Sequence, residues 1–249
     1  MLILLPPSET KRGGGDPALP LDLAGLSRPA LGSARRSALA RVAELSRNLR
    51  TAATALGLGE RNAAEAALNR EIRRGPTMPA IERFDGVLFE ALDALDLDRA
   101  ARGWLDRNVA IASALFGLVA PEDRIPTYRL SAGTRLPGTT LRAIWRRPLG
   151  AELAAASGFV LDLRSEAYVA LGPAPAGSVF LRVVTGESGA VRALNHFNKA
   201  AKGKFVRRLA LDRPSISGVA DLETWAATAG LRLTPGVPGE LNLVVPTPG

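Results

Sequence analysis

The chain has 249 residues, of which 47% are hydrophobic, and this composition predicts a folded protein with a sizeable core. It contains no cysteine and a single histidine, His196, which argues against disulfides, thiolate metal sites and cysteine nucleophiles; we expect no metal site and no cofactor. The formal net charge of +8 at pH 7 fits a polyanionic partner such as nucleic acid or a nucleotide.

A buried strand is predicted over residues 2–5, where the apolar run "LILL" ends at two prolines. The following "SETKRGGGDP" is typical of a loop, so Ser8 and Lys11 follow the carboxyl end of a strand, where α/β folds place ligand sites. The loop is not a P-loop, because the order of glycine, lysine and hydroxyl residue is absent. A plain flexible loop is the alternative interpretation.

Helices are predicted over most of the next eighty residues. Apolar spacing, candidate caps and a turn predict helices in the ranges 33–57, 62–74, 84–95 and 98–106. The run "VAIASALFG" at 109–117 fits either a strand or a buried helix, and its periodicity does not distinguish them.

The segment from Gly117 to Leu130, "GLVAPEDRIPTYRL", is predicted as two short helical pieces joined by a turn. This pattern is similar to a helix-hairpin-helix, whose turn offers backbone N–H groups to a phosphate. The match is weakened by the turn itself, which has Ala-Pro-Glu-Asp where such hairpins prefer glycine.

The second half of the chain alternates helices and strands. Helices are predicted over 139–157, 191–212 and 218–230, with strands over 158–165, 178–185, 231–234 and 240–246. The helix over 191–212 carries a basic face. We found no repeat and no linker, so we predict a single mixed α/β domain over residues 1–249, with a mixed sheet flanked by helices.

Rare polar residue types are concentrated in a few short segments. The only four lysines and the only two tyrosines lie in or beside "SETK", "TYRL", "RSEAY" and "NHFNKAAKGK". Because two of these segments follow strands, we expect them to meet at one end of the sheet in a positively charged cleft. The converging set is Ser8, Lys11, Tyr128, Arg129, Glu166, Tyr168, Lys202 and Lys204. An internal ion-pair network that joins the loops is the alternative.

Five segments, in order along the chain, resemble the YaaA family of peroxide stress proteins. They are "MLILLPPSETK", "FDGVLF", "ALFGLVAPEDRIPTYRL", "RSEAY" and "NKAAKGKFVRR". The resemblance implies a mixed α/β fold with a positively charged cleft and a helix-hairpin-helix. It also implies binding of duplex or structured DNA, and a role in limiting DNA damage and free iron under peroxide stress. The residues that match the family's motifs are Ser8, Lys11, Tyr128, Arg129, Ser165, Tyr168, Lys199, Lys202 and Gly203, whereas Glu166 lies one position early.

The first hypothesis for function is a cytoplasmic DNA-binding protein without catalysis and without a membrane partner, since no run of the chain approaches eighteen apolar residues. Its predicted phosphate-binding residues are Lys11, Tyr128, Arg129, Lys199, Lys202, Lys204, Arg207 and Arg208. Any effect on iron would be indirect, because cations dominate the predicted cleft.

The second hypothesis is an enzyme that acts on a nucleotide, a nucleoside or a modified DNA base. Its predicted catalytic residues are Glu166, Lys11, Ser8 and Tyr168, with cleavage or exchange of an N-glycosidic bond as the reaction. A lysine crowded by cations has a lowered pKa, so an imine between Lys11 or Lys202 and an opened sugar is a variant of this hypothesis. A protein-binding scaffold is the third possibility.

Overall fold

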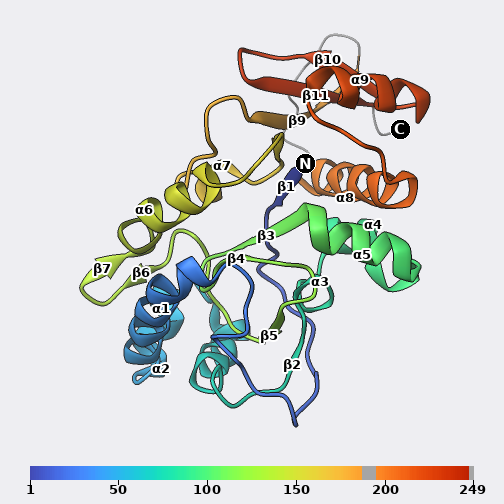
Figure 1. The fold of residues 1–249 in the computed structure, drawn as a ribbon. Helices are drawn as coiled ribbons and strands as arrows, with labels where there is room; N and C mark the ends of the chain where they lie inside the picture. The colour runs from blue at the N-terminus through green and yellow to red at the C-terminus, as the bar shows by residue number, and fades with distance from the viewer. Residues whose placement is uncertain (187–194, 247–249) are drawn as a thin grey trace.

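A seven-stranded mixed sheet runs through the molecule (Figure 1). The structure is a computed structural model that describes residues 1–186 and 195–246. In sheet order the strands are β10 (Arg232–Pro235), β11 (Glu240–Val245), β9 (Val179–Thr185), β8 (Val160–Asp162), β1 (Leu2–Leu5), β3 (Val109–Ser113) and β4 (Gly117–Val119). The five central strands are parallel, and β10 and β4 pair antiparallel at the two edges.

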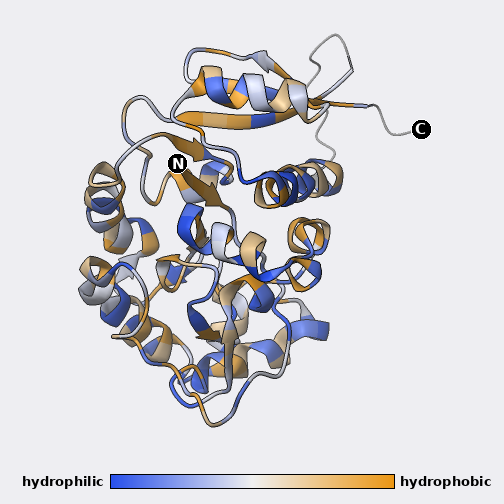
Figure 2. Cartoon of the chain, turned by 45° about the vertical axis from the view of Figure 1, so that its right-hand side comes forward, coloured by the Kyte–Doolittle hydropathy of each residue, from blue (hydrophilic) through white to orange (hydrophobic). Residues whose placement is uncertain are grey.

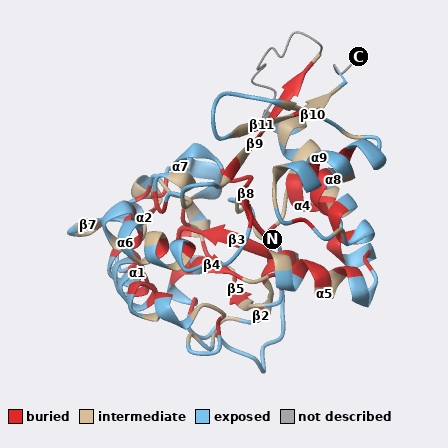
Figure 3. Ribbon diagram, turned by 45° about the horizontal axis from the view of Figure 1, so that its top comes forward, coloured by how far each residue is buried: buried red, intermediate tan, exposed pale blue. Residues whose placement is uncertain are grey.

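The central strands are buried because helices cover both faces of the sheet. Every residue of β1 and β3 is buried, and Figure 3 shows β3 in red. Strands covered on both faces have continuous apolar sequences, as "LILL" and "VAIAS" do. The predicted strand at residues 2–5 is therefore confirmed, and the ambiguous run at 109–117 begins with a strand.

The helices lie in two groups on either side of the sheet (Figure 1). One group contains α4 (Val87–Leu92), α5 (Arg99–Asn108) and α8 (Asn195–Asp212). The other contains α1 (Gly32–Leu45), α2 (Leu49–Ala55) and α6 (Leu141–Ala154), and α9 (Val219–Thr228) packs against β10. The remaining α-helices are α3 (Ala80–Arg83) and α7 (Glu166–Val169), and the 3₁₀ helices are η1 (Pro29–Leu31), η2 (Glu60–Arg70) and η3 (Ala94–Asp96). Two small antiparallel sheets pair β2 (Thr77–Pro79) with β5 (Arg124–Pro126) and β6 (Arg135–Leu136) with β7 (Thr139–Thr140).

Side-chain caps explain where several helices begin. Asp98 accepts a hydrogen bond from the backbone N–H of Ala101 at the start of α5, and Thr140 accepts one from Ala143 at the start of α6. Asn48 caps α2 in the same way, which divides the predicted helix at 33–57 into α1 and α2. The predicted helix at 62–74 is the 3₁₀ helix η2, and residues 191–194 of the predicted basic helix lie outside the described residues.

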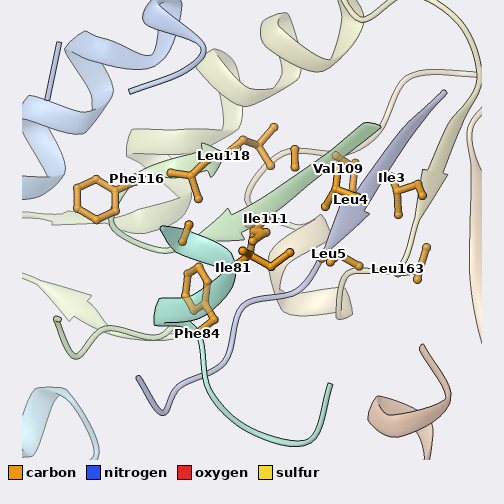
Figure 4. Close-up of a cluster of buried hydrophobic side chains, with 14 of the residues drawn as sticks. Ile3, Leu4, Leu5, Ile81, Phe84, Val109, Ile111, Phe116, Leu118 and Leu163 are labelled. Atoms are coloured by element: carbon orange, nitrogen blue, oxygen red, sulfur yellow. The ribbon is translucent and has the colours of Figure 1, made fainter. Parts of the chain in front are cut away.

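One continuous hydrophobic core joins the sheet to both helix groups. Figure 4 shows side chains of β1, β3 and β4 gathered with Ile81 and Phe84, which come from α3 and the residue after it. Apolar residues colour the strands orange in Figure 2, whereas the helices alternate orange and blue along their length. This pattern is that of a mixed α/β fold with a sheet flanked by helices, as predicted.

The helix-hairpin-helix prediction for Gly117 to Leu130 is wrong. The segment begins with β4, which pairs with β3, and continues to β5, which pairs with β2. Gly117 has a φ of 79°, outside the helical range, and a Cβ atom there would lie 2.7 Å from the Trp145 ring, so this position requires glycine in a conformation that a helix does not use. Pro121 and Pro126 also lack the backbone N–H that a continued helix requires.

Within residues 1–186 and 195–246, no helix combines the length and the apolar character needed to cross a membrane.

Candidate functional site

A pocket of about 520 Å³ opens beyond the carboxyl ends of β1 and β8. These strands are parallel neighbours, so the loops that follow them leave the sheet at the same edge. The pocket is lined by residues 6–10 after β1, residues 86–89 at the start of α4, Leu163, Ser165 and Tyr168 after β8, and His196, Asn198, Lys199 and Lys202 of α8. The structure therefore brings together three of the four segments that the sequence singled out.

Lys202 enters the pocket from α8 with its side chain half-buried. Its Nζ donates a hydrogen bond to the Leu163 carbonyl oxygen at 2.9 Å and lies 5.3 Å from the centre of the Phe180 ring. Burial lowers the pKa of the Lys202 amine to about 8; Asp162 opposes this shift and Arg182 adds to it. The amine therefore stays mainly protonated near neutral pH, but its neutral form is far more accessible than that of an ordinary lysine.

Two neighbours of Lys202 on α8 have unused polar groups in the pocket. The Asn198 Oδ1 atom is buried and has no hydrogen-bond partner among the described residues. Lys199 is exposed and forms no ion pair within the described part of the chain. Buried polar atoms without a partner are rare in folded proteins, so Asn198 marks a position where a ligand donor fits. The sequence analysis missed Asn198, although it lies four residues before Lys202, on the same face of a helix.

Lys11 does not line the pocket but holds the loop after β1. Its Nζ lies 4.1 Å from the centre of the Tyr128 ring and 5.4 Å from that of Phe84, and it donates hydrogen bonds to the Ser8 and Glu9 carbonyl oxygens. Burial, with a smaller effect from Arg129, lowers the pKa of the Lys11 amine to about 7. Because it lies between two rings and bonds to loop carbonyl oxygens, Lys11 holds the loop in place and does not face a ligand.

Tyr128 and Arg129 also support this loop from inside. The Tyr128 hydroxyl is buried, 2.7 Å from the Ser113 Oγ atom, and burial raises the pKa of Tyr128. The Arg129 guanidinium donates to the Glu9 carbonyl oxygen at 3.1 Å and forms ion pairs with the carboxylates of Glu9 and Glu65, each at 3.3 Å. Neither side chain lines the pocket, so the predicted internal network accounts for both of them.

The four predicted catalytic residues are divided by the structure. Ser8 and Tyr168 line the pocket, whereas Lys11 and Glu166 do not. The Glu166 side chain is 84% exposed, and its carboxylate lies 3.9 Å from Arg182. Burial raises the pKa of Tyr168, so its hydroxyl is a donor and acceptor of hydrogen bonds in the pocket, not a source of phenolate.

The remaining predicted phosphate-binding residues of α8 point elsewhere. Arg207 forms ion pairs with Asp93 and Asp96, and Arg208 pairs with Asp212 at 2.7 Å. Lys204 is exposed and lines a different, mainly apolar groove between α8 and β11. Of the eight predicted phosphate-binding residues, only Lys199 and Lys202 line the pocket.

Buried arginines that the sequence analysis did not identify hold the surrounding loops. Arg164 donates to the Asp162 carboxylate at 2.7 Å and to the Gly172 carbonyl oxygen at 2.9 Å, so it orders the chain after β8. Arg83 donates to the Arg12 and Gly14 carbonyl oxygens and holds the glycine-rich loop in the same way. Both side chains are almost fully buried. The apolar residues beside them in the sequence are the signal that could have predicted this burial.

Among the described residues, no group of three or more histidine, aspartate or glutamate side chains is placed to hold a metal ion. The pocket lining combines the cations Lys199 and Lys202 with one carboxylate, Glu9, and with apolar side chains. This arrangement favours a ligand that has both a negatively charged group and an apolar face.

Comparisons with known proteins agree with the motifs. A family model described as peroxide stress protein YaaA matches residues 1–235. A UPF0246 protein of Corynebacterium efficiens is 42% identical over 254 residues, which cover 98% of this chain and 100% of the relative. A UPF0246 protein of Streptomyces coelicolor is 42% identical over 229 residues, which cover 89% of this chain and 87% of the relative. A UPF0246 protein of Caulobacter vibrioides is 34% identical over 191 residues, which cover 68% of this chain and 73% of the relative. The chain therefore belongs to the YaaA family of peroxide stress proteins.

Proposed function

We propose that this protein is a cytoplasmic DNA-binding protein of the peroxide stress response, and that one nucleotide unit of the DNA enters the pocket beside α8. The observation that carries the proposal is that α8 directs Lys199, Lys202 and the Asn198 Oδ1 atom, which has no partner among the described residues, into one pocket. The two ammonium groups would hold a phosphate, and Asn198 would accept a hydrogen bond from the base or the sugar. Protection of DNA follows from this binding, and any effect on free iron would be indirect.

Pocket size supports a single nucleotide unit. A volume of about 520 Å³ is in the range of small-ligand pockets and is too small for a duplex. An unpaired or extrahelical nucleotide reaches such a pocket, while the adjoining duplex stays outside. The net charge of +8 attracts the rest of the polyanion. Structured DNA with unpaired nucleotides is therefore the preferred ligand in this proposal.

The test is fluorescence anisotropy with two labelled duplexes, one fully paired and one with a single unpaired nucleotide, at several salt concentrations. The pocket variant is Lys199→Ala with Lys202→Ala. The matched control is Lys204→Ala with Arg208→Ala, which removes the same charge from the same helix outside the pocket. We expect the pocket variant to lose affinity for the duplex with the unpaired nucleotide, and its slope of log K against log salt to become shallower by about one, because one neutralised phosphate is lost.

The control should keep most of the affinity and most of the preference for the unpaired nucleotide. If the control loses more affinity than the pocket variant, the DNA lies on the opposite face of α8 and the proposed site is wrong. If the wild-type protein binds neither duplex, DNA binding itself is refuted. Free nucleoside monophosphate that binds the pocket while DNA does not would favour the nucleotide-directed alternative.

The enzyme alternative has one residue in its favour. The carboxylate predicted for the N-glycosidic reaction, Glu166, lies outside the pocket and is exposed to solvent, and the carboxylate that does line the pocket, Glu9, is paired with Arg129. The Lys202 amine, in contrast, lines the pocket with a lowered pKa of about 8. Amine chemistry at Lys202 is therefore the catalytic alternative that the geometry favours.

A further inference from the structure

We propose that Lys202 captures an aldehyde carried by DNA, forming an imine with the ring-opened sugar of a nucleotide that has lost its base. This inference rests on the proposed function, because the DNA must first place that nucleotide in the pocket. It goes further by assigning a covalent role to one side chain and a chemical class, a sugar aldehyde, to the ligand.

Position distinguishes Lys202 from the other three lysines. Lys11 is held between the Tyr128 and Phe84 rings and does not line the pocket. Lys204 lines the other groove. Lys199 lines the pocket but is exposed, which suits it to hold a phosphate in water. Lys202 alone among the four combines burial with a place in the pocket wall.

The surroundings of Lys202 leave its amine free to react. Its Nζ donates a hydrogen bond to a neutral carbonyl oxygen, that of Leu163, and no carboxylate of the described residues lies within 4.0 Å of it. The nearby Asp162 carboxylate is bound by Arg164 at 2.7 Å. Among the charged groups around it, Arg182 favours the neutral amine and Asp162 opposes it, and burial is the largest effect. A neutral amine with a free lone pair is the form that attacks a carbonyl carbon.

The chemical step needs no cofactor. The Lys202 nitrogen lone pair attacks C1′ of the open-chain sugar, a C–N bond forms, and the carbonyl oxygen takes a proton to give a carbinolamine. Loss of that oxygen as water, together with the remaining nitrogen proton, gives the imine. An abasic nucleotide suits the pocket because its missing base leaves room for the sugar to approach α8, while Lys199 holds the adjacent phosphate.

The test is reductive trapping with a labelled duplex that contains one abasic site, prepared by enzymatic removal of a uracil. Sodium cyanoborohydride reduces an imine to a stable secondary amine, so the adduct survives a denaturing gel. We expect an adduct with the wild-type protein, and peptide mapping by mass spectrometry should locate it at Lys202. Because the chain has lysine only at positions 11, 199, 202 and 204, the assignment among side chains is unambiguous.

Two variants separate chemistry from binding. Lys202→Arg keeps the positive charge but cannot form an imine, so the adduct should fall to background while anisotropy still shows binding of the abasic duplex. Lys204→Arg makes the same change in the other groove and should trap as the wild type does. An adduct that maps to the N-terminus or another lysine, or binding without any adduct, would overturn the role of Lys202 and leave DNA binding intact. Absence of binding to any duplex would instead refute the proposed function, and this inference with it.

Discussion

The packing of α8 against α4 makes a sharp prediction about Gly203. A Cβ atom at Gly203 would lie 2.2 Å from the Leu88 carbonyl oxygen, 2.9 Å from the Ala91 Cβ atom and 3.0 Å from the Leu92 nitrogen. Backbone atoms of α4 cannot turn aside as a flexible side chain does, so Gly203→Ala forces the two helices apart by about 1 Å. Overpacking of this kind costs about 3 kcal/mol at the upper end of its range. Alanine in place of glycine recovers about 1 kcal/mol of helix propensity, which leaves a net loss of about 2 kcal/mol.

Gly150 of α6 is the matched control. It is also inside a helix, but a Cβ atom there meets nothing within 4 Å. Gly150→Ala should therefore raise the free energy of unfolding by about 0.5–1 kcal/mol, opposite in sign to Gly203→Ala. Urea denaturation followed by circular dichroism measures both. Because Gly203 follows Lys202 directly, the displaced helix should also weaken DNA binding in the anisotropy assay. A Gly203→Ala protein as stable as the wild type would refute the close approach of α8 and α4.

Two further predictions concern buried charges. Lys11 has a folded-state pKa of about 7, below its usual value, so between pH 7 and the usual lysine range the unfolded chain binds more protons than the folded chain. The free energy of unfolding therefore rises with pH across this range and falls as the pH drops toward 7. Lys11→Met should flatten the rise of the free energy of unfolding between pH 7 and 9, measured by urea titration; an unchanged slope would contradict the lowered pKa. Arg164→Met should cost about 3–5 kcal/mol, because it leaves the buried Asp162 carboxylate unpaired. Thermal unfolding should show partial recovery when Asp162→Leu is added, and no recovery would mean that Arg164 acts mainly through the Gly172 carbonyl oxygen.

Much of the fold could be predicted from local sequence. The apolar run at residues 2–5 ends at two prolines, and Asp98 and Thr140 cap the helices that follow them, because these signals act over a few residues. The segment from Gly117 to Leu130 could not be predicted in this way. Its strands exist because β3 and β2 supply pairing partners, and short strands are stable only with such partners.

The candidate site shows the same division at the level of single side chains. Sequence by itself determined that scarce lysines and tyrosines cluster in segments that follow strands, and that these segments match one family. Only the tertiary structure decided which of the cations face the pocket. Lys199 and Lys202 are three residues apart and share a helix face, whereas Lys204 lies about 200° around α8 from Lys202.

Ion pairing is the second property that local sequence does not determine. Arg207 is neutralised by Asp96, which lies 111 positions earlier in the chain, and Arg129 by Glu9, which lies 120 positions earlier. Such partners meet only when α8 packs on α4 and the loop after β1 folds over the residues that follow β5. A run of basic residues therefore shows where charge lies in the sequence, while long-range packing decides which of those charges remain available to a ligand.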